Sequence, residues 1–390
     1  MGSKRVAAAT CYFQHNYGSM LQAYATQRAV EQLGYEVMNL STAGIARDIR
    51  NRKLRYYGRQ LTNWHIVQEK WGAVKRALRQ KTDPALRAHI AKRDACFRAF
   101  QQQTFHVTEP LTWAQMHDYA ASCQAVLVGS DQLWLPSNIA ADFYTLTWAP
   151  EAVNKVAYAT SFGIGSLPPR YLRAAHDFLG RIQHVSVREQ AGQAIVRAAT
   201  GREVPVVCDP TLLFAAPQWA ELVPERDIVG HPYIFCYFLG DNPNQRVFAR
   251  TVRERLGLPI VATLHLDNYI PGDEGFPDET RYDIGPAEFV NLIRHASLVL
   301  TDSFHGTVFS VLHGRPFLTF RRFRAAGGLS TNSRMDSLFS LLGLPERLAV
   351  PGEAALAQLS QTIDYEPVWQ RLAALRQASW QYLEEALADE

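Results

Sequence analysis

The chain alternates short apolar runs with helical patterns along almost its whole length. Its opening predicts a strand over residues 6–13, a helix over 18–33 and a second strand over 35–40. The helix rests on apolar residues at helical spacing before Gly34, and the strands rest on short continuous apolar runs. A strand, a helix and a strand in this order predict two parallel strands joined by a crossover helix. The alternation therefore restricts the fold to the α/β class.

The same alternation resumes after residue 120. Further strands are predicted over 125–128, 156–159, 184–187, 233–239, 259–266, 298–301 and 317–320, and helices over 189–199, 242–256 and 286–296. Because 390 residues exceed one ordinary core, we expect two doubly wound, Rossmann-like α/β domains that face a cleft. The expected ranges are 1–183 for the first domain, with a basic helical insert at about 44–105, 184–362 for the second domain, and 363–390 for a last helix that packs back on the first domain.

Composition excludes several classes of protein. Apolar residues make up 47% and charged residues 20%, as in soluble globular proteins. No apolar run approaches the roughly 18 residues of a membrane span, and the first apolar run predicts a strand rather than a signal peptide. The five cysteines are scattered without a CxxC pair, which argues against a disulfide scaffold or a zinc site. We therefore expect a cytoplasmic protein without a metal.

Charge is distributed unevenly along the chain. Residues 47–98 contain fifteen Lys or Arg against four acids, although the whole chain carries only +3. Such asymmetry is typical of surfaces that meet anionic lipid or nucleic acid. No nucleic-acid-reading motif accompanies the basic segment, so we expect no nucleic-acid partner. A solvated helical hairpin on the first domain remains the alternative.

The stretch LVLTDSFHGTVFSVLHGRPF, residues 298–317, joins a buried-type strand to a helix. Ligands of open parallel sheets bind beyond the carboxyl ends of the strands, and helix N-termini attract anions. In this loop Ser303, Gly306 and Thr307 suit the approach of a phosphate, and His305 can exchange protons near neutral pH. Positive charge can come from five downstream arginines: Arg315, Arg321, Arg322, Arg324 and Arg334. The alternative is a helix cap with a structural histidine.

Three other loops follow predicted strands. The first contains Asn16, Tyr17 and Gly18 at a helix start, where a turn with a cap is the alternative. The second, Gly129, Ser130 and Asp131 before Trp134, has the carboxylate and aromatic ring typical of sugar sites, or is a capped loop. The third places Arg188 at a strand end, where its guanidinium can clamp a carboxylate or phosphate, or form a structural ion pair with Glu189.

Several familiar motifs are missing from the sequence. Gly163 and Gly165 lack the third glycine of a dinucleotide fingerprint. The sequence also contains no Walker A loop, no HExxH pair and no Gly-x-Ser-x-Gly elbow. Dinucleotide binding, P-loop chemistry and the common hydrolase mechanisms are therefore not indicated.

Taken together, the loops resemble those of the polysaccharide pyruvyl transferase family. The matching segments, in order, are HNYGSMLQAYATQRAVEQLGYEV, VLVGSDQLW, VAYATSFG, SVREQAGQAIV, VCDPTLLF, YIFCYFLGDN, GPAEFVNLIRHASLVLTDSFHGTVFSVLHGRPF and SRMDSLFSLLGL. They span most of the chain, and their combination is specific although no single motif is. Residues 44–105 match poorly.

The resemblance implies a fold like the two-domain GT-B glycosyltransferases and phosphoenolpyruvate (PEP) as donor, with no further cofactor. It implies a product in which pyruvate bridges two hydroxyls of one sugar as a ketal. Family members commonly act on saccharides that are lipid-linked intermediates or polymer repeats at the cytoplasmic membrane. The basic segment is then expected to make peripheral contact with anionic membrane, each Lys or Arg adding about 1 kcal/mol.

The resemblance also assigns roles to particular residues. It implicates His305 and Arg188 in the active site, together with a basic residue some twenty positions after the histidine, for which Arg321, Arg322 and Arg324 all qualify. Donor contacts are then expected from Ser303, Gly306, Thr307, Arg321 and Arg322, and acceptor contacts from Asn16, Tyr17, Gly18, Gly129, Ser130 and Asp131. His305 would handle the proton of the attacking hydroxyl or of the leaving phosphate. Arg188 and one of Arg321 or Arg322 would hold the PEP anion.

Two other functions share this architecture. One is a GT-B glycosyltransferase, which would bind a nucleotide sugar in place of PEP. The other is a glycan-binding protein without catalysis, which is disfavoured because His305 and Arg188 are both present.

Overall fold

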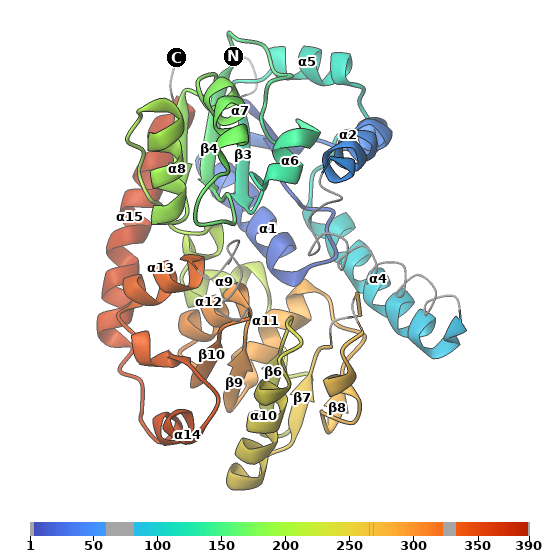
Figure 1. Ribbon diagram of the computed structural model, residues 1–390, viewed down its shortest axis with the longest axis vertical. Coiled ribbons are helices and arrows are strands. Elements are labelled where there is room, and N and C mark those ends of the chain that lie inside the picture. Colours follow the sequence, from blue (N-terminus) through green and yellow to red (C-terminus); the bar gives the residue numbers. More distant parts are fainter. Residues whose placement is uncertain (1–3, 60–81, 265, 268, 323–332, 389–390) are drawn as a thin grey trace.

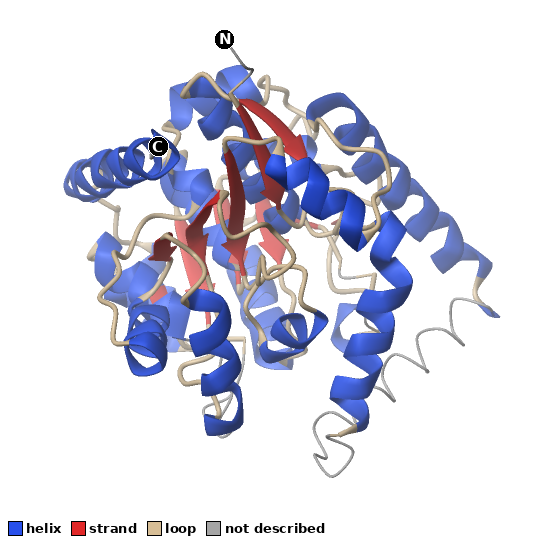
Figure 2. Ribbon diagram, turned by 90° about the horizontal axis from the view of Figure 1, so that it is seen from above, coloured by secondary structure: helices blue, strands red, loops and turns tan. Residues whose placement is uncertain are grey.

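The computed structural model describes residues 4–59, 82–264, 266–267, 269–322 and 333–388. Two parallel sheets form the two halves of the molecule, and helices cover both faces of each sheet (Figures 1 and 2). The predicted α/β class with two Rossmann-like, GT-B-like domains is confirmed.

The first sheet has the order β2-β1-β3-β4-β5, with every pair of neighbours parallel. Its strands are β1 (Arg5–Ala9), β2 (Glu36–Asn39), β3 (Ala125–Asp131), β4 (Asn154–Thr160) and β5 (His184–Val187). Most strand residues are buried, as parallel sheets covered on both faces require. The strand order reverses between β1 and β3, so the loops after these two strands border the crevice where ligands bind.

Seven helices of the described chain belong to this half. They are α1 (Tyr17–Gln32), α2 (Ala46–Gly58), α4 (Pro84–Thr104), α5 (Trp113–Ala121), α6 (Pro136–Ala141), α7 (Pro169–Leu179) and α8 (Gln190–Thr200). The basic segment forms α2 and α4, and its residues 60–81 lie outside the described part of the chain. Arg93 of α4 reaches the second domain, where its Nη1 lies 3.1 Å from Asp267 Oδ2.

The second sheet has the order β11-β10-β9-β6-β7-β8, again parallel throughout. Its strands are β6 (Ile234–Tyr237), β7 (Ile260–Ala262), β8 (Glu279–Thr280), β9 (Leu298–Thr301), β10 (Phe317–Phe320) and β11 (Leu348–Ala349). The helices that follow β5 and α8 in the chain are α9 (Ala216–Leu222), α10 (Pro243–Leu256), α11 (Pro286–His295), α12 (Phe304–Leu312), α13 (Ser333–Leu342), α14 (Glu353–Leu359) and α15 (Glu366–Ala388). The strand order reverses between β6 and β9, which makes the loops after them the second half of the crevice.

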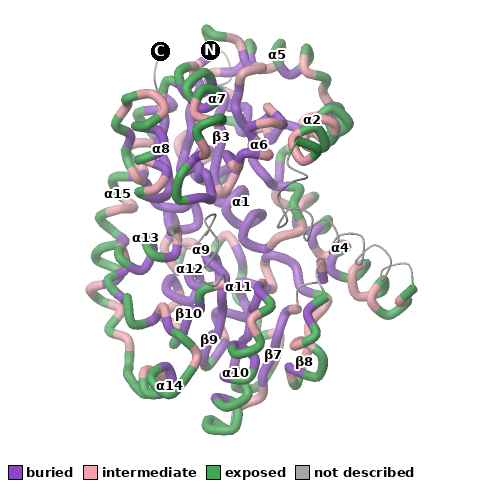
Figure 3. The backbone as a smooth tube through the Cα atoms, viewed as in Figure 1, coloured by how far each residue is buried: buried purple, intermediate pink, exposed green. Residues whose placement is uncertain are grey.

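Helix α1 lies between the two domains and is buried along most of its length (Figure 3). At its start the Tyr17 ring stacks on Phe289 of α11, with ring centroids 4.8 Å apart, and the Tyr17 hydroxyl donates to the Ile284 carbonyl at 3.2 Å. A helix that is buried on all sides must be apolar or have its polar groups satisfied inside the protein. The polar Gln22 meets this requirement by donating to Ser19 O at 2.8 Å.

The sheet pairing corrects the predicted domain boundary at residue 184. Strand β5 belongs to the first sheet, and Val207 N donates to Val187 O at 2.9 Å, so the first domain continues to about this residue. The spacing pattern located the strand but carried no information about which sheet it joins. At the other end of the chain, α15 packs back on the first domain, where Tyr382 Oη donates to Ala157 O at 3.1 Å.

Candidate functional site

The loops at the two strand-order reversals meet at a cavity of about 210 Å³. The first domain lines it with Gln14, Asn16, Ser19, Asp131, Gln132, Leu133, Leu135 and Asn138, and the second domain with Leu239, Ser303, Phe304, His305, Arg322 and Arg334. The volume falls below the roughly 300–1,000 Å³ of pockets for drug-sized ligands, so this cavity suits a small metabolite.

His305 lies in the first turn of α12 and lines the cavity. Ser303 caps the helix by accepting a hydrogen bond from Gly306 N at 3.3 Å. On the facing helix α1, a Cβ built at Gly18 would lie only 2.0 Å from His305 Nδ1. A glycine at this position therefore lets α1 and the imidazole touch.

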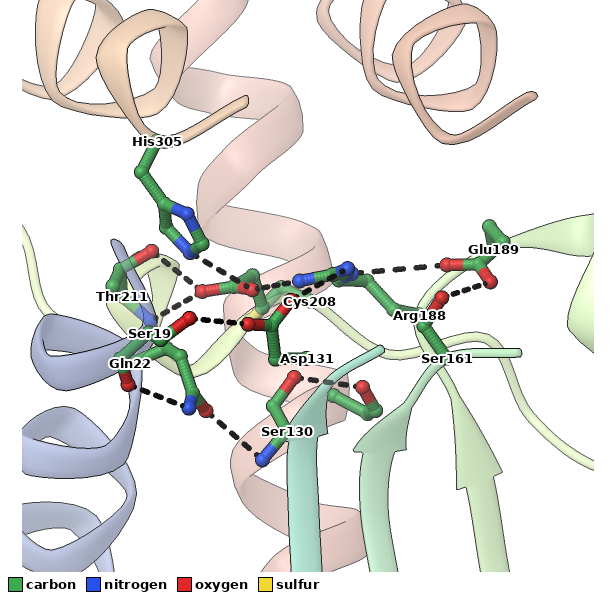
Figure 4. Close-up of polar contacts among 12 residues, drawn as sticks. Ser19, Gln22, Ser130, Asp131, Ser161, Arg188, Glu189, Cys208, Thr211 and His305 are labelled. Atoms are coloured by element: carbon green, nitrogen blue, oxygen red, sulfur yellow. Dashed lines mark hydrogen bonds and ion pairs between the residues drawn. The ribbon is translucent and has the colours of Figure 1, made fainter. Parts of the chain in front are cut away.

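Asp209 lies beside Nε2 of the His305 imidazole. Its carboxylate is completely buried, and His305 Nε2 lies 3.6 Å from its Oδ2. Thr211 donates to its Oδ1 through both its backbone N–H, at 3.0 Å, and its hydroxyl, at 2.6 Å (Figure 4). Burial alone would raise the pKa of Asp209, but His305, Arg188 and Thr211 outweigh burial and hold this pKa below its usual range. A fixed carboxylate beside Nε2 can orient a histidine that accepts and returns a proton.

Arg188 is buried among carboxylates at the end of β5. Its Nη1 donates to Asp209 Oδ2 at 2.7 Å, and its Nη2 lies 3.6 Å from Asp131 Oδ1 (Figure 4). Burial would lower the pKa of Arg188, but these carboxylates and Glu189 raise it above its usual range. The guanidinium also lies over the Phe304 ring, 4.7 Å from its centroid. Arg188 therefore contacts residues that line the cavity, but it is not itself among the described lining residues.

Arg322 and Arg334 bring positive charge to the cavity. Burial, together with the charges of Arg188 and Arg322, lowers the pKa of Arg334 to about 10. Its Nε is buried without a hydrogen-bond partner among the described residues. A buried cation in a cavity with an unused donor indicates an anionic ligand.

Sequence reasoning left Arg321, Arg322 and Arg324 as equal candidates for this charge. Arg322 lines the cavity, and its Nη2 donates to Asp302 O at 3.4 Å. Arg321 pairs instead with Asp336 of α13 and lines a different depression, so its donor contact stays a prediction that this cavity does not support. Arg324 lies outside the described residues.

Asp131 and Asn16 form the wall contributed by the first domain. Ser19 Oγ donates to Asp131 Oδ2 at 2.7 Å, and Asn16 caps α1 by accepting from Ser19 N at 3.0 Å. Burial would raise the pKa of Asp131, but Arg188, His305 and Arg334 outweigh it and lower this pKa. The wall therefore presents an ionised carboxylate and an amide, groups that suit the hydroxyls of a sugar.

Two of the predicted acceptor residues turn away from the cavity. Gly129 and Ser130 continue β3 instead of forming a loop, because β3 pairs with β4 as far as Asp131. Ser130 is fully buried, and its Oγ donates to Ala159 O at 2.7 Å. A Cβ at Gly129 would lie 2.1 Å from the Tyr158 carbonyl oxygen. Neither residue is among the described residues that line the cavity, so their acceptor contacts stay predictions.

Four further predicted residues are not among the described residues that line the cavity, so their ligand contacts stay predictions. Tyr17 joins the domains, and Gly18 makes room for His305. A Cβ at Gly306 would lie 2.7 Å from Thr301 Oγ1, so this glycine lets α12 pack closely on β9. Thr307 is fully buried and its hydroxyl donates to Ser303 O at 3.0 Å. Of the donor residues predicted in this loop, Ser303 reaches the cavity.

Sequence reasoning missed several residues that build the site. Asp209 stands in a segment, VCDPTLLF, that was used only to establish the resemblance. Ser19, Gln132 and Asn138 were not singled out, and Arg334 was named only as a source of charge. An aspartate between Cys208 and Pro210 in an otherwise apolar run was the available signal, because a carboxylate in such a run must be paired when buried.

The described residues contain neither a metal-binding cluster nor a membrane-spanning helix. No group of three His, Cys, Asp or Glu side chains in the described ranges is placed to hold a metal ion. Within the same ranges, no helix combines the length and the apolar character needed to cross a bilayer. All five cysteines are unpaired.

Comparisons with known proteins add to this geometry. A family model described as polysaccharide pyruvyl transferase matches residues 16–322. No match was found among curated proteins.

Three solved structures that match this chain do so at low identity. Acinetobacter baumannii MurG is 10% identical, each chain is covered to 98%, and the TM-score is 0.44. A UDP-GlcNAc 2-epimerase from Methanocaldococcus jannaschii is 11% identical over 95% of this chain and 98% of its own, with a TM-score of 0.47. The wall teichoic acid polymerase TagF is 10% identical over 98% of this chain and 88% of its own, with a TM-score of 0.48. No function is inferred from these three.

We expect Asp209→Asn to lower the free energy of unfolding at pH 7 by about 3–5 kcal/mol, because it removes the nearest carboxylate partner of the buried Arg188. The folded-state pKa of Asp209 lies below the unfolded value, so its stabilisation is complete above about pH 4 and is lost as the pH falls further. The deficit of the variant should therefore shrink below pH 4. Urea denaturation between pH 7 and pH 3 measures it.

The matched control is Asp177→Asn, which changes an exposed aspartate on α7. This control should stay within about 0.5 kcal/mol of the wild type. A deficit for Asp209→Asn that is equally large at pH 7 and pH 3 would contradict the ionised, paired state of this carboxylate.

Proposed function

The chain belongs to the polysaccharide pyruvyl transferase family, and from this premise we propose a specific reaction for it. The protein moves pyruvate from PEP onto two hydroxyls of a sugar in a polysaccharide or in its lipid-linked precursor. The products are a cyclic ketal and phosphate. The observation that carries the proposal is the placement of His305 beside Arg322 and Arg334 in one small cavity between the domains.

PEP suits the wall of the cavity that the second domain provides. It is a small anion with a carboxylate and a phosphate, and charge-assisted hydrogen bonds to such groups contribute about 1.5–3 kcal/mol each. Arg322 and Arg334 supply two guanidinium groups, and the first turn of α12 adds the positive end of a helix. The cavity of about 210 Å³ favours this compact donor over a nucleotide sugar.

The acceptor sugar lies against the opposite wall in this proposal. Asp131 and Asn16, supported by Ser19, face the cavity from the first domain. An ionised carboxylate accepts hydrogen bonds from sugar hydroxyls, and an amide can donate and accept them. Donor and acceptor would then meet at His305, which lies between the two walls.

The reaction forms two carbon–oxygen bonds at C2 of PEP, the first by addition and the second by displacement of phosphate. One sugar hydroxyl attacks C2, and C3 gains a proton to become the methyl group. The second hydroxyl of the sugar then attacks C2 while the bond to the phosphate oxygen breaks. One hydroxyl proton is thus balanced by the proton on C3, and the other leaves with phosphate.

We assign the proton of the attacking hydroxyl, or of the leaving phosphate, to His305. Asp209 lies 3.6 Å from His305 Nε2 and is fixed by Thr211, so it can hold the ring and stabilise the imidazolium ion. Arg188 serves as a positioning residue, because it binds Asp209 and lies beside Asp131. Its guanidinium lowers the pKa of both carboxylates and so favours their ionised forms.

We expect PEP to bind the wild-type protein in isothermal titration calorimetry, while UDP and GDP give no response. Arg334→Ala and Arg322→Ala should each weaken PEP binding by roughly tenfold or more, since each removes a charge-assisted contact. Arg321→Ala is the matched control, because this neighbouring arginine pairs with Asp336 outside the cavity. Its affinity for PEP should stay within about twofold.

Three results would count against the proposed donor. Nucleotide binding without PEP binding would support a nucleotide-sugar glycosyltransferase. Saccharide binding without either donor would support a glycan-binding protein. An equal loss in Arg321→Ala and Arg322→Ala would place the anion elsewhere.

His305→Ala should retain PEP binding but lower phosphate release from PEP by about 10²–10⁴-fold, the usual contribution of a general acid or base. Phosphate release with a panel of saccharide acceptors measures this loss. Circular dichroism establishes that the variant is folded. Near-normal turnover in the folded variant would remove the role assigned to His305.

We also propose that the basic segment makes peripheral contact with anionic membrane. Arg47, Arg50 and Arg55 of α2 are exposed, and each cation near an anionic bilayer adds about 1 kcal/mol. Co-sedimentation with liposomes should therefore increase with the fraction of anionic lipid and decrease with salt. Binding that is independent of anionic lipid would exclude this contact.

A further inference from the structure

A cavity of about 520 Å³ lies on the second domain, between α9, the end of α12 and α15. Leu312 and His313 line it at the end of α12, the helix whose first turn carries His305. Leu312 follows His305 by seven residues, which at 1.5 Å per residue places it about 10 Å further along the helix. The described residues that line this cavity are all different from those that line the cavity between the domains. We call it the α12/α15 pocket.

Three arginines bring positive charge to the α12/α15 pocket. Arg294 of α11 is only 7% exposed and donates to Asn291 Oδ1 at 2.8 Å, while Nε of Arg315 and of Arg376 donates to backbone carbonyls at 3.2 and 2.8 Å. Within the described ranges, the hydrogen bonds of all three guanidinium groups go to uncharged oxygens. Buried cations are ordinarily paired, so an anion in this pocket would supply counter-charge.

His313 adds a polar atom that lacks a partner. Its Nε2 is buried and has no hydrogen-bond partner in the part of the chain that the structure describes. Burial, with the charges of Arg294 and Arg315, lowers the pKa of this imidazole to about 3, so the ring is neutral near pH 7. Buried polar atoms without a partner are uncommon in native proteins. This nitrogen and the three arginines both indicate that the pocket takes a polar, anionic ligand.

The other walls suit a ring that carries hydroxyls. Trp369 of α15 is 42% exposed, but its ring is fixed, because Nε1 donates to Val311 O at 3.0 Å and Tyr365 stacks on it with centroids 5.4 Å apart. Alanine, proline and leucine side chains add apolar surface. Glu225, which lies 3.3 Å from His295 Nε2, contributes a carboxylate that can accept hydrogen bonds from hydroxyls. An apolar, aromatic wall with a few polar groups is typical of small-molecule sites.

We propose that the α12/α15 pocket is a binding site for a sugar monophosphate. The phosphate binds the arginines, the apolar face of the sugar ring covers Trp369, and sugar hydroxyls bind Glu225. The charge of Glu225 repels a second phosphate group, which disfavours nucleoside diphosphates. The volume of about 520 Å³ falls within the roughly 300–1,000 Å³ of pockets for small ligands. This inference does not rest on the proposed PEP donor, since the pocket is separate from the cavity between the domains.

Glucose 1-phosphate is a suitable probe, because it combines one phosphate with one sugar ring. Calorimetric titration should show binding to the wild type, and roughly tenfold weaker binding of glucose and of inorganic phosphate. The double variant Arg315→Gln/Arg376→Gln should lose roughly tenfold or more in affinity for glucose 1-phosphate, because it removes two charge-assisted contacts. Arg371→Gln is the matched control: Arg371 also lies on α15 and donates to a backbone carbonyl at 2.8 Å, but it is not among the described lining residues. This control should leave the affinity within about twofold of the wild type.

Trp369→Ala tests the contact with the sugar ring separately. It should weaken the binding of glucose 1-phosphate but leave that of inorganic phosphate unchanged, because phosphate alone contacts the arginines. Circular dichroism establishes that each variant is folded. Inorganic phosphate that binds as tightly as glucose 1-phosphate would show an adventitious ion only and overturn the inference. UDP that binds more tightly than glucose 1-phosphate would overturn the assigned ligand class.

Titration of the same proteins with PEP separates this inference from the proposed function. Arg334→Ala should leave glucose 1-phosphate binding unchanged, and the double variant should leave PEP binding unchanged. Wild-type protein that binds PEP but not glucose 1-phosphate, or equal glucose 1-phosphate affinity in the wild type and the double variant, would overturn the α12/α15 pocket alone. Glucose 1-phosphate binding without PEP binding would support the pocket and reject the PEP donor. PEP binding that is lost in the double variant but kept in Arg334→Ala would overturn both proposals.

Discussion

The structure depends on the buried carboxylate of Asp209. A buried charge is tolerated only when it is paired and hydrogen-bonded, and the partners of this one come from distant parts of the chain. Arg188 reaches it from the end of β5 in the first domain, and His305 from α12 in the second. Thr211 supplies two further hydrogen bonds to it. Assembly of the two domains and placement of the imidazole therefore satisfy the same electrostatic requirement.

Close packing around α1 converts this electrostatic centre into a site. The helix is buried between the domains, and Gly18 leaves just the space that the His305 ring occupies. At the same helix start, Ser19 holds Asp131 on the opposite wall of the cavity. One helix end thus sets the distance between His305 and the wall of the first domain, while Arg322 and Arg334 supply positive charge from the second domain.

Much of the fold could be predicted because short apolar runs and helical spacing locate individual strands and helices. The predicted strands at 184–187, 298–301 and 317–320 coincide with β5, β9 and β10. Since ligands gather beyond the ends of parallel strands, the same reasoning brought Asn16, Asp131 and His305 to one cavity. Ser130 was wrongly placed in a loop, because a Gly-Ser-Asp cluster resembles a turn while pairing with β4 keeps it in the strand.

The sequence by itself determined the α/β alternation and the loop that carries His305, because burial repeats with the period of each element. Its matching segments, in order along the chain, indicated the family. Tertiary structure alone decided which of two adjacent arginines reaches the cavity: Arg322 lines it, while Arg321 pairs with Asp336. It also decided that Asp209 lies 3.6 Å from the imidazole Nε2, and that the chain pairs β5 with the first sheet. These outcomes depend on contacts between residues far apart in the chain, whose partners exist only once both sheets have formed.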